Sequence, residues 1–231
     1  MLKTRRADER GRTLWKWLDS RHTFSFGEYY DPKHAGFRSL RVLNDDRVKP
    51  AEGFGTHSHR DMEIISYVLE GSLEHKDSMG TGSVIVPGEI QMMRAGTGIS
   101  HSEYNHSRSE PVHFLQIWIE PDSSGLAPAY FQQAIDRKAA QSHLALLASK
   151  SGREHSVQIH QDVELWLGLV DSDQLRTLPL AAGRSAWVQI ARGRAAVNGI
   201  NLTEGEGLAA SDEAELSISG KDAEILVFDL A

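Results

Sequence analysis

The chain has 231 residues, of which 40% are hydrophobic and 25% are charged, a composition typical of soluble globular proteins. It contains no cysteine, which excludes disulfides, thiolate metal sites and a cysteine nucleophile, so any metal must be bound through nitrogen and oxygen. No run approaches the ~20 apolar residues that span a bilayer, and the charged N-terminal segment lacks the apolar core of a signal peptide. We therefore expect a cytoplasmic protein with no membrane partner.

The formal net charge is −7 at pH 7, and it is unevenly distributed. Residues 1–50 contain 12 Lys and Arg against 7 Asp and Glu, whereas the remainder contains 13 against 25. The basic residues near the start alternate with acidic ones and accompany no DNA-reading motif, which favours a solvated, salt-bridged surface. We expect no nucleic-acid partner, and the sequence does not identify a protein partner.

Short segments rich in β-branched and aromatic residues, separated by Gly, Pro, Asp and Ser, recur through the first half of the chain. This punctuation predicts a β-sandwich or barrel rather than alternating α/β units. A second strand is expected directly after Gly71, and residues 112–121 have the pattern of a strand buried on both faces. The predicted strand segments of this half are 39–46, 62–71, 83–88, 89–96 and 112–121.

The pattern changes after Pro121, where a loop precedes the best helical candidate of the chain, residues 132–141. A second β-rich block follows, and its residues 188–199 repeat the order strand, Gly turn, strand. The predicted strand segments of this block are 156–170, 184–199 and 214–230. We expect an all-β fold of two tandem barrels joined by a short helical or irregular linker, with domains at 1–130 and 131–231.

Two pairs of metal-ligand residue types, each spaced i to i+2, stand out: His57 with His59, and His101 with Glu103. Side chains two apart in a strand point to the same face, so each pair can aim at one point. A single His-x-His is often incidental, but two matched pairs in turn-rich contexts indicate a site for a divalent transition metal.

Glycines precede both pairs, and Gly98 in particular is expected to shape the turn that delivers His101. A ligand pocket beside this site would need apolar walls, for which residues near the motifs are candidates, although core packing is the commoner role for such side chains. These candidates are Phe24, Phe26, Phe54 and Met92. Among the other histidines, His75 is the best candidate for a contact that supports one of the metal-binding residues.

The residues match a known family at this point. The segment 53–59 (GFGTHSH), with Glu63 and Gly71, resembles the first cupin motif, and residues 96–101 (GTGISH) resemble the second. Together with the upstream segment 23–46, they closely resemble the pirin family. This resemblance implies a bicupin fold, two double-stranded β-barrels with one mononuclear metal in the N-terminal barrel.

Carried over by motif, the metal ligands implied by the resemblance are His57, His59, His101 and Glu103. Glu63 occupies the position where many other cupins place a carboxylate ligand, and we expect it to be structural. The C-terminal barrel is expected to bind no metal. Its candidate ligands, His160 and Glu164, would face alike in a strand, but two ligands do not define a site.

The resemblance extends to the bacterial quercetin 2,3-dioxygenases of this family. It implies a metal-dependent dioxygenase whose partners are a flavonol and O₂, which cleaves the C2–C3 bond of the flavonol and releases carbon monoxide. The expected cofactor is one divalent metal, Fe(II) first, with Mn, Ni, Cu or Zn as alternatives. Glu103 is the expected catalytic base for the substrate hydroxyl.

Two other functions stay open at the level of sequence. The first is a non-catalytic, metal-dependent redox sensor or regulatory binding protein of the pirin type, which would bind metal without substrate-dependent O₂ uptake. The second is zinc-dependent isomerase or hydrolase chemistry, which the ligand types allow and no other feature supports.

Overall fold

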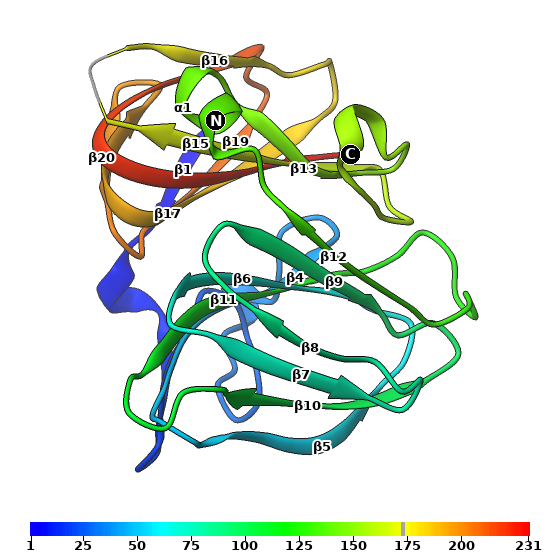
Figure 1. Cartoon of the computed structure of the whole chain (residues 1–231). Coiled ribbons are helices and arrows are strands. Elements are labelled where there is room, and N and C mark those ends of the chain that lie inside the picture. Colours follow the sequence, from blue (N-terminus) through cyan, green and yellow to red (C-terminus); the bar gives the residue numbers. More distant parts are fainter. Residues whose placement is uncertain (172–173) are drawn as a thin grey trace. The chain divides into compact units, whose positions relative to one another are not determined.

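The computed structural model describes residues 1–171 and 174–231, and the fold is all-β, as expected (Figure 1). The chain divides into two compact units. One comprises Gly11–Ile135, and the other combines Met1–Arg10 with Asp136–Ala231.

The sequence-based division into 1–130 and 131–231 differs from these units at the start of the chain. Residues 1–10 were placed in the first domain, but β1 (Leu2–Arg5) pairs antiparallel with β19 (Gly207–Ser211). A strand belongs to the sheet that satisfies its backbone hydrogen bonds, and this pairing joins residues more than 200 positions apart, which local sequence patterns do not report.

The unit Gly11–Ile135 is built from two antiparallel sheets. The seven-stranded sheet has the order β12-β9-β6-β11-β4-β3-β2, and its strands are β2 (Gly11–Leu14), β3 (Leu18–His22), β4 (Leu40–Val48), β6 (Glu63–Glu70), β9 (Glu89–Arg94), β11 (Val112–Ile119) and β12 (Ala129–Ala134). The four-stranded sheet has the order β5-β10-β7-β8, with β5 (Gly53–His59), β7 (Leu73–Asp77), β8 (Gly82–Ile85) and β10 (Ile99–Asn105). A short 3₁₀ turn, η2 (Pro32–His34), lies between β3 and β4.

The predicted strand pair around Gly71 is confirmed, and its two strands belong to different sheets. β6 lies in the seven-stranded sheet and β7 in the four-stranded sheet, so the chain passes from one to the other at Gly71. Gly71 has φ +75°, and a Cβ atom there would lie 2.5 Å from the Pro111 carbonyl oxygen. Only glycine fits this crossing, because a side chain would collide with backbone.

β11 is the strand predicted to be buried on both faces, and the structure confirms this. It lies between β6 and β4, and seven of its eight residues are buried. Apolar residues on both faces explain why the segment shows no polar alternation.

The second unit contains one nine-stranded sheet among the described residues. Its main path has the order β1-β19-β17-β20-β15-β13-β14, while β16 pairs with β20 and β18 pairs with β17. The remaining elements of this unit are η1 (Ala7–Glu9), α1 (Arg137–Ser142), β13 (Ala145–Ser149), η3 (Arg153–His155), β14 (Val157–Gln158), β15 (Val163–Val170), β16 (Arg176–Pro179), β17 (Ser185–Val197), β18 (Ile200–Thr203) and β20 (Glu215–Leu230).

Two local predictions for the linker and second block need correction. The expected helix at 132–141 begins only at Arg137, where the Asp136 side chain caps α1 by accepting from the Ala139 amide, because the preceding residues form β12 along β9. The expected turn at Gly193 is a bulge within β17, whose pairing with β20 continues on both sides of it.

No helix among residues 1–171 and 174–231 is long and apolar enough to cross a lipid bilayer.

Candidate metal centre

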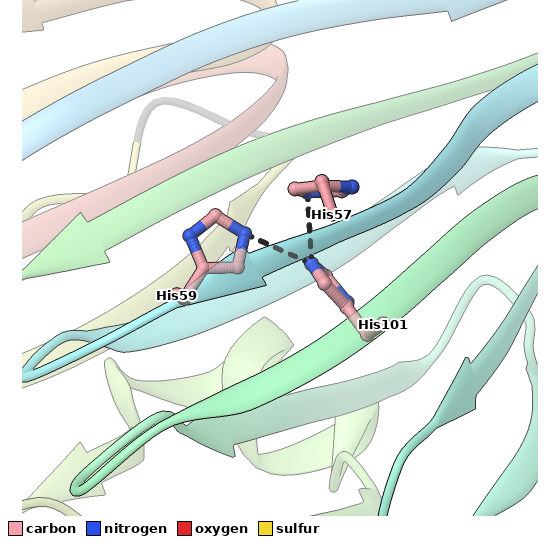
Figure 2. A group of neighbouring side chains, drawn as sticks. All are labelled: His57, His59 and His101. Atoms are coloured by element: carbon pink, nitrogen blue, oxygen red, sulfur yellow. Dashed lines mark hydrogen bonds between the residues drawn. The ribbon is translucent and has the colours of Figure 1, made fainter.

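Three histidines from two adjacent strands converge inside the unit Gly11–Ile135. β5 supplies His57 and His59, and β10 supplies His101, which lies directly opposite His57 in the antiparallel register. The i to i+2 spacing places both β5 imidazoles on the face toward which His101 points, and Figure 2 shows the three rings directed at one another.

The distances between the ring nitrogens fit a single metal ion. His101 Nε2 lies 3.0 Å from His59 Nε2 and 3.1 Å from His57 Nε2. Nitrogen ligands of one ion with metal–nitrogen bonds of ~2.1 Å lie about this far apart, so the three nitrogens could be bound by a single metal ion.

The tautomer of His57 is fixed by the backbone. Its Nδ1 lies 2.8 Å from the carbonyl oxygen of Gly55, which can only accept a hydrogen bond, so Nδ1 carries the proton. The lone pair is left on Nε2, the atom that faces the other two histidines.

A buried chain of hydrogen bonds fixes His101 in the same way. Asp77 Oδ2 accepts from His75 Nε2 at 3.1 Å, so His75 Nδ1 carries a lone pair and accepts from His101 Nδ1 at 3.4 Å. The side chains of His75 and Asp77 are fully buried. His101 Nε2 is thereby left as a free ligand atom, and His75 makes the supporting contact for which the sequence marked it as a candidate.

Two of the three imidazoles, those of His59 and His101, are held neutral. Burial, followed by the nearby His101 and His57, lowers the pKa of His59 to about 4, and burial with His57 and His75 lowers the pKa of His101 to about 3. Burial works against ionisation of Asp77, but hydrogen bonds from His75 and from the Thr81 and Met79 amides outweigh it and lower the pKa of that carboxyl. At neutral pH His59 and His101 therefore offer lone pairs rather than protons, as a metal requires.

Glu103 occupies a different position from the three histidines. Its carboxylate groups with His75 and His101, and accepts hydrogen bonds from Ser66 Oγ at 2.9 Å and Gln116 Nε2 at 2.8 Å. The pairing register shifts between His101 and Glu103, a bulge that redirects the strand.

Glu63, the alternative carboxylate, is completely buried in β6, opposite Arg94 and Ile119 in its two pairings. It does not line the pocket at the histidines or join a cluster of potential ligands among the described residues.

A cavity of about 320 Å³ opens at the histidines and extends between the two sheets of this unit. Of the four predicted wall residues, Phe26 and Phe54 line it, whereas Phe24 and Met92 are core residues with 2% and 0% exposure. The complete lining is Thr13, Trp15, Leu18, Ser20, His22, Phe26, Gly27, Glu28, Asn44, Asp46, Phe54, His57, His59, His101, Glu103, Gln116 and Trp118.

Sequence reasoning did not find the residues of the opposite wall. Trp118 of β11 packs edge-on against His59 at 4.9 Å between ring centroids and against Phe26 at 5.4 Å. Asp46 lines the same cavity, and burial, which outweighs a hydrogen bond from Ser20, raises its pKa to about 7. The signal in the sequence that could have identified this wall was the presence of two polar residues, Asp46 and Gln116, inside strands that are otherwise buried.

The sequence led us to expect that the candidate ligands of the second unit share a strand, and this expectation is wrong. His160 lies in a bend before β15, whereas Glu164 lies in β15 and forms an ion pair with Arg153 at 2.8 Å. Both clusters of potential metal ligands found among the described residues belong to the unit Gly11–Ile135.

An all-β fold with a histidine cluster inside one β unit that can hold a metal ion is typical of metalloproteins of the cupin class. Residues 3–119 match the family described as Pirin, and residues 146–230 match the quercetinase C-terminal cupin domain. The chain is 46% identical over 231 residues to an Escherichia coli K12 protein named quercetin 2,3-dioxygenase, covering 100% of this chain and 99% of the relative. It belongs to the pirin family.

Solved structures agree with this assignment. The crystal structure of YhhW from E. coli is 46% identical and superposes with a TM-score of 0.96, covering 100% of this chain and 98% of that one. The nickel(II) complex of the same bacterial pirin gives 0.95, at 46% identity and coverage of 100% and 99%. A quercetin 2,3-dioxygenase from Acinetobacter baumannii, at 24% identity, a TM-score of 0.75 and coverage of 95% and 83%, shares the fold.

Proposed function

We propose that this protein is a metal-dependent dioxygenase that cleaves flavonols such as quercetin at the C2–C3 bond, using O₂ and releasing carbon monoxide. The observation that carries the proposal is the convergence of three imidazoles at one side of an aromatic-lined cavity. The cavity volume of about 320 Å³ falls in the range of small-molecule sites. The activity named for the E. coli relative supports the same chemistry.

His57, His59 and His101 would hold the metal, with Glu103 proposed as the fourth ligand. When bound, a divalent ion lowers the pKa of an enolic hydroxyl and lets the substrate react with O₂ beside it. Fe(II) is our first choice of metal, and the nickel(II) complex of the E. coli relative makes nickel a necessary comparison.

The chain's own residues supply positioning and proton transfer. Trp118, Phe26 and Phe54 offer flat apolar surfaces that exclude water from the ligand face of the histidines. Glu103 is proposed to take the proton of the substrate hydroxyl. Hydrogen bonds donated by Ser66 and Gln116 hold its carboxylate in a fixed orientation.

The test is substrate-dependent O₂ consumption by protein loaded anaerobically with Fe(II), Mn(II) or Ni(II). Loss of quercetin, uptake of O₂ and release of carbon monoxide are expected in equal amounts. His57→Ala and His101→Ala are expected to lower kcat/KM by at least ~10³-fold, since each removes a ligand atom. His106→Ala is the control, because His106 is exposed and lies outside the cavity.

Unchanged turnover in both ligand variants would refute the proposed site. Tight metal binding without O₂ uptake for any metal would instead support the regulatory alternative, in which a partner protein is released by chelation.

A further inference from the structure

The inner face of the seven-stranded sheet carries a row of polar residues across neighbouring strands. His22 of β3 pairs in register with Asn44 of β4, Asn44 with Gln116 of β11, and Gln116 with Ser66 of β6. Most of this row is satisfied internally: His22 Nδ1 lies 2.8 Å from Asn44 Oδ1, and Ser66 and Gln116 both donate to Glu103.

Asp46 lies two residues beyond Asn44 on the same face of β4 and lines the cavity. The residue is 3% exposed, and although Ser20 donates a hydrogen bond to its carboxyl, Oδ1 has no hydrogen-bond partner within residues 1–171 and 174–231. A buried acceptor without a donor costs free energy, so such an atom indicates that a ligand supplies the missing hydrogen bond.

Gln116 presents a second such acceptor. Its Nε2 donates to Glu103 Oε2 at 2.8 Å, which fixes the orientation of the amide and turns Oε1 away from that carboxylate. Oε1 is buried and has no partner in the described part of the chain. Gln116 and Asp46 belong to adjacent strands and are diagonal neighbours on one face, close enough for one small molecule to reach both.

We propose that Asp46, with Gln116 beside it, binds a second hydroxyl of the substrate, so that the cavity selects aromatic enols that carry at least one hydroxyl beyond the one presented to the histidines. The inference rests on the proposed function and specifies its substrate class. The hydroxyl donates its proton to a side-chain oxygen, and no bond to carbon changes.

The placement of the histidines and of the two acceptor residues supports the proposal that they bind different hydroxyls of the substrate. The histidines lie on β5 and β10 of the four-stranded sheet, whereas Asp46 and Gln116 lie on β4 and β11 of the seven-stranded sheet, and all of these residues line the same cavity. A flat ligand held at one end by the histidine cluster therefore presents its other substituents to the polar wall. The terminal torsion of an aspartate is soft, so its oxygen can turn toward an arriving hydroxyl at little cost.

The experiment compares two ligands that share the metal-binding enol, quercetin and 3-hydroxyflavone, which lacks the other hydroxyls. Their dissociation constants are measured anaerobically on nickel-loaded, full-length protein, so that binding is read without turnover. Wild type is expected to bind quercetin roughly ten-fold more tightly than 3-hydroxyflavone. Asp46→Val removes both acceptor oxygens and should abolish this preference, while leaving the affinity for 3-hydroxyflavone within about two-fold.

Asp46→Asn, which retains one acceptor oxygen, should keep an intermediate preference and remains informative if the valine variant does not fold. Asp45→Asn is the matched control, because Asp45 is the adjacent buried carboxyl of β4, lies outside the cavity and binds His113. This variant should match wild type.

Equal binding of the two ligands by wild type, or a preference that survives in Asp46→Val, would overturn the role of Asp46 and leave the dioxygenase proposal intact. Binding of neither flavonol by the metal-loaded wild type would overturn both.

Discussion

At the scale of residues, the site depends on which ring nitrogens carry protons. The chain from Asp77 through His75 to His101 sets the tautomer of one candidate ligand, and the Gly55 carbonyl sets that of His57. Both sets of contacts come from residues outside the three-histidine cluster, and each acts on one histidine through one hydrogen bond.

Asp77→Asn is expected to weaken metal binding by about 10–100-fold. An asparagine there can accept from the Met79 and Thr81 amides through its oxygen and donate to His75 through its amide, which reverses the proton order and places a proton on His101 Nε2. Titration with Ni(II), followed by absorbance or calorimetry, measures the affinity. Asp45→Asn, which alters another buried Asp–His pair, is the control, and equal affinities in the two variants would contradict the assignment.

The raised pKa of Asp46 predicts how the stability of the metal-free protein depends on pH. Burial raises its pKa from 3.8 to about 7, so the folded state holds this proton more tightly than the unfolded state does. The stability that the protonated carboxyl provides is complete below pH ~4 and is lost as pH rises through about 7. Asparagine does not ionise, so the stability of Asp46→Asn relative to wild type should increase over this interval, by at most roughly 4 kcal/mol.

Urea denaturation of both proteins between pH 4.5 and pH 8.5, expressed as the difference in unfolding free energy, measures this effect. The histidines titrate in both proteins and cancel in the difference. A difference that does not change with pH would show that Asp46 ionises normally in the fold.

At the scale of elements, the turn between β9 and β10 determines where His101 points. The sequence favoured Gly98 as its positional glycine, and Gly98 has φ +140°, but the tighter constraint lies at Gly96. Gly96 has φ +48°, and a Cβ atom there would lie 2.0 Å from the Leu126 carbonyl oxygen, which also accepts the Thr97 amide. The segment after β11 thus packs against this turn and fixes it.

Gly96→Ala is expected to destabilise the protein by roughly 2–4 kcal/mol, because it adds both backbone strain and a collision with main chain. Gly80→Ala is the control, since Gly80 also has a positive φ, +90°, but no atom within 4 Å of the added methyl, and should cost about 1 kcal/mol. Urea unfolding midpoints measure both. Equal losses would mean that the contact with Leu126 is not limiting.

At the scale of the whole molecule, the two β units differ in the functional features that they contain. The histidine cluster and its cavity belong to Gly11–Ile135, whereas the second unit is completed by the first ten residues through β1 and its partner β19. Its two longest strands, β17 and β20, pair with each other and hold an apolar cluster that includes Val188, Ile225 and Val227. The two family matches, residues 3–119 and 146–230, together cover parts of both units, and the first begins within the residues that complete the second unit.

The sequence by itself determined the all-β class, most strand positions and the common face of His57 and His59, while the family resemblance implied that His101 joins them. The common face follows from spacing along a strand, where a period of two sets the direction of each side chain. The tertiary structure alone decided the opposite wall, because Asp46, Gln116 and Trp118 come from β4 and β11, and their common face depends on cross-strand register. Register is a relation between distant segments, so no local pattern in either segment contains it.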